Sequence, residues 1–311
     1  MLSAMQTVIP RRNFLPRAIG IAAASAAVSV WPGAALGQGR VVRTTGSRLK
    51  LGLNAYSFDR PLKAGTMTLE DVVHYCAQHG IDALDATGYY FPGYPKVPSD
   101  ESIFRLKRTA FLNGVALSGT GVRNDFTLPD AARRNGEVQL VKDWIEVASK
   151  LGAPMIRVFT GPRMPEGHTF DQVLEWMIPG FIECAAFGQR HGVIVGLQNH
   201  NDFVKTADQA IRIIDAVNSA WFGSILDVGS LREKDPYQEI EKLLPYAVSW
   251  QLKESVGYGT KETPTDLARL KTIIDKGGYR GYLPIETLGD GDPVVKVAVF
   301  IEQVRKVFGF S

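Results

Sequence analysis

The sequence predicts an α/β protein folded as a (β/α)8 barrel, also called a TIM barrel. From about residue 50, short apolar runs alternate with longer amphipathic ones, and the alternation occurs eight times. Each period spans about 33 residues, close to the roughly 30 that a strand–helix–strand unit needs. Glycine closes several of the helical runs directly before the next apolar run, at Gly80, Gly114, Gly152, Gly192 and Gly278. Glycine can adopt the left-handed conformation that ends a helix, so these positions support the same alternation.

The expected strands are the short apolar runs, taken in chain order. They are Leu51–Tyr56, Ala83–Ala86, Ala116–Ser118, Met155–Thr160, Ile194–Gln198, Ser224–Asp227, Ala247–Leu252 and Tyr282–Glu286. The amphipathic runs between and after them predict helices. The clearest of these are Thr68–His79, Glu137–Leu151, Thr206–Val217 and Pro293–Phe308.

Residues that favour helix starts agree with this order. Thr68 and Asp71 have the spacing of a capping box, and Pro264 and Pro293 suit the first turn of a helix. A doubly wound open sheet is the alternative fold, but no glycine-rich phosphate-binding fingerprint follows a strand. No linker or shift in composition divides the body, so residues 38–311 are expected to form one domain.

Residues 1–37 are predicted to be a twin-arginine-type signal peptide. Arg11 and Arg12 precede an uncharged, alanine-rich run, Ala18–Val30. This run has about 13 residues, whereas a membrane span needs about 20. Ala35–Gly37 is the expected cleavage site, because its residues are small or apolar. An ordinary secretory signal or a retained anchor is the alternative. The mature chain is therefore expected to be periplasmic or secreted, without a membrane span.

Charge and cysteine content exclude several classes of protein. The formal net charge of +3 equals the three arginines of the first 37 residues, which contain no acidic residue; the body has 32 basic and 32 acidic residues. A neutral body argues against nucleic-acid binding, which normally needs a basic face. Two cysteines are too few for a disulfide-stabilised small protein.

Polar residues stand at or just beyond the carboxyl ends of the expected strands, where barrels of this kind carry their active sites. Buried polar groups need partners, so their convergence at one rim is informative. In chain order they are Asn54, Tyr56, Ser57, Asp85, Thr87, Ser118, Arg123, Asn124, Arg157, Gln198, His200, Asp227, Gln251, Lys253 and Glu286. The predicted substrate-binding residues are Asn54, Tyr56, Asp85, Arg123 and Asn124.

Four segments resemble the sugar phosphate isomerase/epimerase family, which has a xylose isomerase-like barrel. They are Gly192–His200, Ile225–Gly229, Trp250–Glu254 and Leu283–Glu286, and Gly80–Asp85 is similar to the second strand of that family. The resemblance covers almost the whole body. It implies the barrel predicted above and a carbohydrate as the small-molecule partner.

The resemblance also implies a divalent metal, held by one residue from each of strands five to eight, usually Glu, Asp, His and Glu. Those positions here are Gln198, Asp227, Gln251 and Glu286. Glutamine offers a carbonyl oxygen without charge, so weaker binding is expected. Oxygen ligands favour Mn²⁺ or Mg²⁺, with Zn²⁺ or Co²⁺ as alternatives. The two glutamines leave open a metal-free site in which the amides bind substrate hydroxyls.

In the epimerases of that family, the glutamates of strands five and eight pass protons on two faces of the substrate. An amide is not a general base, which leaves Glu286 as the predicted base. Lys253 lies two residues after Gln251 and faces the same way, and His200 lies two residues after Gln198. Each is predicted to carry the second proton or to polarise a substrate oxygen. An ion pair for Lys253 and a packing role for His200 are the alternatives.

These residues predict an exported isomerase or epimerase that transfers a proton next to the carbonyl of a keto-sugar or sugar derivative. A lyase or hydratase that performs β-elimination on a 3-keto-glycoside is one alternative, since it needs a single base. A non-catalytic sugar-binding barrel that has lost its metal is another. An endonuclease on the same barrel is disfavoured by the neutral body and by the other histidines, which fall outside the strand ends. Whether the chain forms a homo-oligomer is left open.

Overall fold

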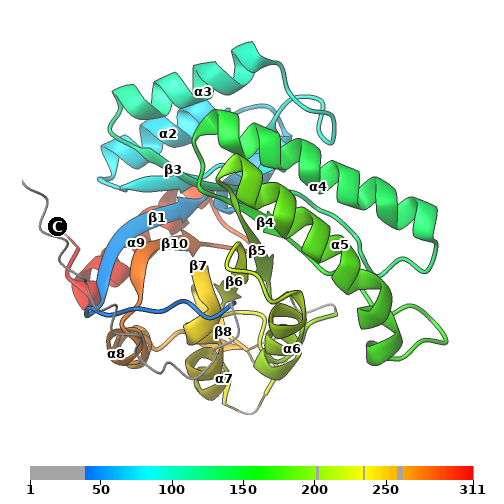
Figure 1. Ribbon diagram of the computed structural model, residues 1–311. Coiled ribbons are helices and arrows are strands. Elements are labelled where there is room, and N and C mark those ends of the chain that lie inside the picture. The colour runs from blue at the N-terminus through cyan, green and yellow to red at the C-terminus, as the bar shows by residue number, and fades with distance from the viewer. Residues whose placement is uncertain (1–38, 201–202, 234, 258–261, 311) are drawn as a thin grey trace, which may run out of the picture. The chain divides into compact units, whose positions relative to one another are not determined.

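The barrel predicted from the sequence is present. The computed structural model describes residues 39–200, 203–233, 235–257 and 262–310, and eight parallel strands within these ranges form a closed barrel (Figure 1). In chain order they are β1 (Arg48–Asn54), β2 (Ala83–Asp85), β3 (Ala116–Gly121), β4 (Met155–Val158), β5 (Ile194–Gln198), β6 (Phe222–Asp227), β7 (Ala247–Lys253) and β10 (Arg280–Glu286). The barrel closes where β1 pairs with β10, with Leu51 opposite Leu283.

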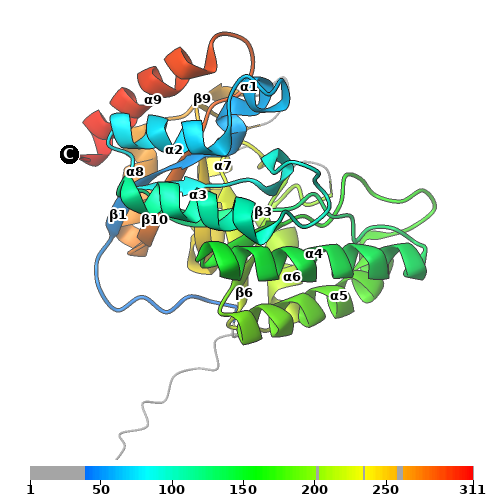
Figure 2. The same cartoon turned by 90° about the horizontal axis from the view of Figure 1, so that it is seen from above.

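Helices surround the strands, and Figures 1 and 2 show the two longest, α4 and α5, side by side on the outside of the barrel. The helices that cover the barrel are α2 (Leu69–Gln78), α3 (Asp100–Leu112), α4 (Ala131–Leu151), α5 (Phe170–His191), α6 (Ala207–Val217), α7 (Pro236–Leu243), α8 (Leu267–Gly277) and α9 (Pro293–Phe308). Shorter elements lie in the connections: η1 (Ala55–Phe58), α1 (Asp59–Lys63), η2 (Gly88–Tyr90), η3 (Leu244–Tyr246), and the antiparallel pair β8 (Ser255–Val256) and β9 (Thr263–Pro264).

Most of the predicted helix boundaries are confirmed by backbone and side-chain geometry. Thr68 and Asp71 form a capping box, and Pro293 is in the first turn of α9. The five glycines that were expected to end helices all have positive φ, between 58° and 77°. The prediction for Pro264 is wrong. Pro264 pairs in β9, and α8 begins only at Leu267, where the Asp266 side chain accepts a hydrogen bond from the backbone N–H of Arg269.

Strand alternation decides which side chains reach the interior of the barrel. Trp250 on β7 is fully buried against Tyr279, with ring centroids 5.6 Å apart in an edge-to-face arrangement. Its neighbours Gln251 and Lys253 project from the opposite face of the strand, because successive side chains alternate. The apolar face of β7 is thus used for packing, and its polar face is left for the site.

Three smaller points concern the predicted signal peptide, membrane spans and the two cysteines. Residues 1–37, the predicted signal peptide, lie outside the described residues. Within the described ranges, no helix has the length and apolar character needed to cross a membrane. Cys76 and Cys184 are buried and not bonded to each other, and burial raises the pKa of both thiols above the usual value.

Candidate active site

The carboxyl ends of the strands surround a cavity of about 200 Å³. Seven of the predicted site residues line it together, namely Tyr56, Arg123, Gln198, His200, Gln251, Lys253 and Glu286. The remaining lining residues are Tyr89, Arg157, Phe159 and Leu288. The expectation that strand ends from different parts of the sequence meet at one rim is therefore met for these residues.

Lys253 forms ion pairs with two carboxylates, those of Asp227 and Glu286. Its Nζ lies 2.8 Å from Oδ2 of Asp227 and 3.3 Å from Oε1 of Glu286. The three side chains are 11%, 0% and 5% exposed, so solvent screens the two ion pairs little. Burial alone would lower the pKa of Lys253, but the charges of Asp227 and Glu286 outweigh it and raise that pKa above its usual value. The lysine is therefore held in its charged form.

Asp227 is the most fully bonded residue of the group. One oxygen, Oδ1, accepts the backbone N–H of Gly229 at 2.9 Å, while Oδ2 accepts the hydroxyl of Ser230 at 2.8 Å. The side chain of Asn199 holds the backbone of Asp227 on both sides, with two hydrogen bonds of 2.9 Å. Burial alone would raise the pKa of Asp227, but Lys253 lowers it on balance. Asp227 is thus a fixed, ionised anchor for Lys253.

The two glutamines bond to this anchor and to each other. Nε2 of Gln198 donates to Oδ2 of Asp227 and to Oε1 of Gln251, both at 2.7 Å. Oε1 of Gln198 and Nε2 of Gln251 are buried without a hydrogen-bond partner in the described part of the chain. One amide oxygen and one amide nitrogen therefore remain to be satisfied at this side of the cavity.

A second polar group lies on the β1–β2 side. Asn54 accepts the backbone N–H of Tyr56 at 2.8 Å and the hydroxyl of Thr87 at 3.2 Å, and it donates to Oδ2 of Asp85 at 3.3 Å. Asp85 is buried, and its burial raises its pKa to about 6, with Arg157 opposing this effect and Glu286 adding to it. Its other oxygen has no partner among the described residues. Asn54 and Asp85 thus support the rim from behind the cavity lining.

Asp85 provides a test of this electrostatic environment. Its pKa in the folded chain is above the unfolded value of 3.8, so the folded state binds more protons and the wild type loses stability as the pH rises from about 4 to about 6. The loss reaches about 3 kcal/mol at most. Asp85→Asn is expected to raise the melting temperature at pH 8 and to leave it unchanged at pH 4, as measured by calorimetry. A difference independent of pH would contradict the raised pKa.

Arg157 and Tyr89 also line the cavity, although no role was predicted for either of them from the sequence. Nη2 of Arg157 donates to the Tyr89 hydroxyl at 3.1 Å, and its guanidinium lies 5.5 Å from the Tyr89 ring and 5.4 Å from the Phe159 ring. The guanidinium of Arg123 also lies 5.3 Å from the centroid of the Tyr89 ring. Tyr89 belongs to an aromatic segment that follows β2. Tyr89 both packs there and faces the cavity.

Asn124 and the histidines differ in where they lie relative to the cavity. Asn124 is buried, and its side chain makes hydrogen bonds of 2.7 and 2.9 Å with the backbone of Phe159, so it joins the loops after β3 and β4. His200 lines the cavity and lies edge-to-face on Phe159, with centroids 5.2 Å apart. The remaining histidines lie on or beside helices, as expected, at His74, His79, His168 and His191.

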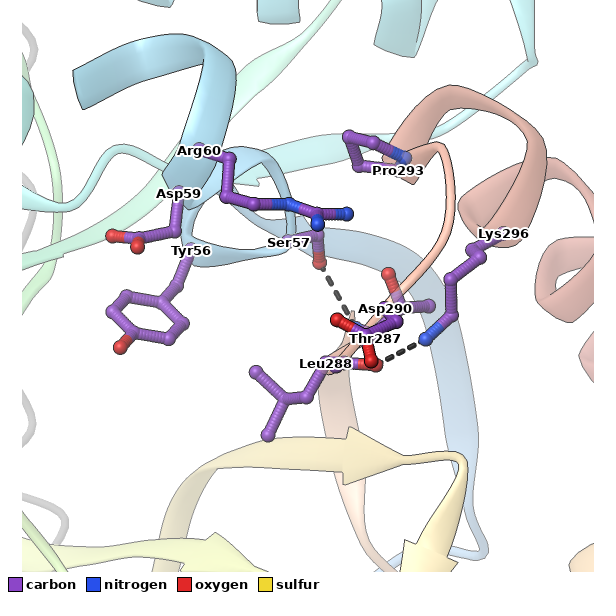
Figure 3. A pocket seen from close by; sticks show the side chains of 10 residues that line it. Tyr56, Ser57, Asp59, Arg60, Thr287, Leu288, Asp290, Pro293 and Lys296 are labelled. Carbon is purple, nitrogen blue, oxygen red and sulfur yellow. Dashed lines mark hydrogen bonds between the residues drawn. The ribbon is translucent and has the colours of Figure 1, made fainter. Parts of the chain in front are cut away.

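The cavity continues into two neighbouring depressions. One of about 380 Å³ shares Arg123, Phe159 and His200 with it. The other, of about 300 Å³, shares Tyr56 and Leu288, and Figure 3 shows it between η1, α1 and the loop after β10. That loop is held by a hydrogen bond from the backbone of Thr287 to the Ser57 hydroxyl and by Lys296, which donates to the carbonyl of Leu288. The site is therefore part of a longer cleft.

This fold and site define a xylose isomerase-like barrel. The chain belongs to the family described as xylose isomerase-like TIM barrel, whose model matches residues 73–303. Comparison with curated proteins finds no match. Among solved structures, D-psicose 3-epimerase from Clostridium cellulolyticum H10 with D-tagatose is similar, at 17% identity and a TM-score of 0.69, with 83% of this chain and 99% of that one covered.

Two further structures have the same fold. The apo form of 3-keto-D-glucoside 4-epimerase from E. coli matches at 15% identity with a TM-score of 0.67, covering 83% of this chain and 100% of that one. The IolI protein, solved with a zinc atom, matches at 16% identity with a TM-score of 0.68, covering 84% and 100%. At these identities the likeness establishes the fold.

The residues present do not fit the divalent metal that the resemblance implies. Among the described residues, no group of three or more His, Cys, Asp or Glu side chains is placed to hold a metal ion. The two carboxylates of the expected ligand set already bind an ammonium group, and the Gln198 amide presents its nitrogen to Asp227. A nitrogen that carries hydrogens is a donor and not a ligand. Acid–base chemistry at this site therefore falls to the chain's own side chains.

Proposed function

We propose that this chain is a carbohydrate-active enzyme that transfers a proton next to the carbonyl of a keto-sugar, with Glu286 as the base. The observation that carries the proposal is the position of Glu286, which ends β10 with its carboxylate on the cavity and beside Lys253. Among the residues that line this cavity, all of them in the described part of the chain, Glu286 is the one carboxylate. Sugar epimerases with the same fold support a carbohydrate substrate.

The proton transfer would proceed in two steps. Glu286 removes the proton from the carbon next to the carbonyl, the electron pair of that C–H bond forms a C=C bond, and the carbonyl oxygen takes the negative charge. Return of a proton from Glu286, after exchange with solvent, to the former carbonyl carbon gives isomerisation. In that case the hydroxyl proton on the first carbon moves to the former carbonyl oxygen, so that the carbonyl group changes carbon. Return of a proton to the first carbon from the opposite face gives epimerisation and needs a second donor, for which His200 and Lys253 line the cavity.

β-Elimination from a 3-keto-glycoside is a second candidate, and two observations favour it. Gln198 occupies the position of the second glutamate, and elimination needs only one base. The cleft extends past Arg123 and His200 into a further 380 Å³, which gives room for an aglycone. In this reaction the bond to the glycosidic oxygen breaks after the proton is removed, and the leaving oxygen takes up a proton, so that an unsaturated keto-sugar and an alcohol result.

Deuterium exchange tests the proposal. The purified protein would be incubated in D₂O with a panel of ketoses and 3-keto-glycosides. Proton NMR would follow the signal of the hydrogen next to each carbonyl. Exchange with a new sugar isomer is expected for an isomerase or epimerase, and release of the alcohol for a lyase. Sugar binding without any exchange across the panel would contradict proton transfer and indicate a non-catalytic sugar-binding barrel.

A further inference from the structure

Lys253 occupies the gap between the two carboxylates that remain from the expected ligand set. Its Nζ contacts Asp227 on β6 at 2.8 Å and Glu286 on β10 at 3.3 Å. The strand that carries it, β7, pairs with both of those strands, so the lysine lies centrally between them. Lysine ends in a compact point charge, which is the closest that a side chain comes to a metal cation.

The amide of Gln198 is oriented to donate to Asp227, the partner of Lys253, and not to bind a metal. A carboxylate only accepts hydrogen bonds, so Gln198 must turn its NH₂ group toward Asp227 at the observed 2.7 Å. The second hydrogen of the same NH₂ group then goes to Oε1 of Gln251. Both amides and Asp227 form one continuous chain of hydrogen bonds. A metal bound to Asp227 through this set would have to break that chain.

The backbone near Asp227 also leaves room for the lysine. A Cβ atom on Gly229 would lie 2.6 Å from Cδ of Lys253, which is closer than carbon atoms pack. The N–H of the same glycine holds Oδ1 of Asp227. Gly229 therefore serves both members of the ion pair, by admitting the side chain of one and orienting the carboxylate of the other.

We propose that the ammonium group of Lys253 is the resident cation of this site in place of a divalent metal, and that it binds the carbonyl oxygen of the substrate. The first part stands independently, whereas the second rests on the proposed function. When Glu286 removes a proton, the negative charge forms on the carbonyl oxygen, and a positive group already in place there stabilises it. Lys253 is buried but lines the cavity, so its ammonium group can reach such an oxygen.

Metal binding and thermal stability test the first part without any substrate. Wild type, Lys253→Arg and Lys253→Met would be purified without a metal-affinity tag, treated with EDTA, and incubated with Mn²⁺, Mg²⁺ or Zn²⁺. Bound metal would be measured by elemental mass spectrometry after gel filtration, and melting temperature by calorimetry. Lys276→Met, which removes a 74% exposed lysine paired with Glu241, is the matched control.

Wild type and Lys253→Arg are expected to bind no stoichiometric metal and to melt at the same temperature with and without it. Lys253→Met is expected to melt about 10 °C lower in EDTA, because two buried carboxylates lose their cation, whereas Lys276→Met should melt like the wild type. One metal ion per wild-type chain would overturn the proposal, and so would an undiminished melting temperature for Lys253→Met. If Lys253→Met does not fold, the metal content of wild type and Lys253→Arg decides alone.

The second part is tested by deuterium exchange with a sugar that the wild type turns over. Lys253→Met is expected to lose this exchange, because the carbonyl oxygen loses its cation, and an undiminished exchange rate would overturn the second part. EDTA treatment is expected to leave the exchange rate unchanged, and added Mn²⁺ should not raise it. Loss of exchange in EDTA with recovery in Mn²⁺ would overturn the proposal. A protein that turns over no sugar but still binds no metal would count against the proposed function while supporting Lys253 as the resident cation.

Discussion

Replacement of Glu286 by glutamine is expected to reduce turnover by about 10²–10⁴-fold, the usual contribution of a general base. Glutamine has nearly the same shape but cannot accept the proton. The fold should be retained, because the main chain of β10 pairs with β1 and β7 whatever side chain stands at its end. Steady-state kinetics and circular dichroism on the purified variant would measure both properties.

The matched control for this experiment is Glu302→Gln on α9. Its carboxylate is 73% exposed and pairs with Arg305 three residues later, and Glu302 does not line the cavity. It should keep wild-type turnover. Full activity in Glu286→Gln would remove Glu286 from the role of base, and equal losses in both variants would show that the assay reports protein quality instead of chemistry.

Replacement of Asp227 by asparagine is expected to lower the free energy of unfolding by about 3 kcal/mol at pH 7, as for other buried ion pairs that lose one partner. The lysine would keep only Glu286, at 3.3 Å, and the hydrogen bonds from Ser230 and Gly229 would end on a neutral group. Urea denaturation of both proteins measures the difference.

The pH dependence of that difference follows from the lowered pKa of Asp227. A carboxyl with a lowered pKa stabilises the fold above its unfolded pKa, and this stabilisation is lost as the pH falls through the folded value. The gap between wild type and Asp227→Asn should therefore be full at neutral pH and close in acid. The side chain of Asp100 is 58% exposed and pairs with Lys150, so Asp100→Asn should change stability by at most about 1 kcal/mol. A similar small effect for Asp227→Asn would contradict a buried anchor.

The fold was predictable because local signals and the global pattern agree. Apolar strand runs, the capping box at Thr68 and the glycines with positive φ all specify the same alternation. The failures have local causes. The helix α4 begins at Ala131, six residues before the predicted Glu137, because Asp130 caps it through the backbone N–H of Arg133. Pro264 has no N–H to donate and lies in the short edge pair β8–β9, a position that proline tolerates as well as a helix start.

The site was predictable only in part. The ends of parallel strands in a barrel must meet, so the common location of Gln198, Gln251, Lys253 and Glu286 follows from their order in the sequence. Their partners do not follow from it. Whether Lys253 extends to Asp227 or into solvent depends on its rotamers and on the space beside Gly229. The direction of the Gln198 amide depends on which acceptors surround it, and those acceptors are known only from the folded structure.

A crystal structure of the chain with a bound keto-sugar would test proton transfer by Glu286 most directly. The expected result is a sugar in the 200 Å³ cavity, with its carbonyl oxygen at hydrogen-bond distance from Nζ of Lys253 and the neighbouring carbon facing the carboxylate of Glu286. A sugar bound elsewhere in the cleft, or one whose carbonyl lies away from both side chains, would contradict it.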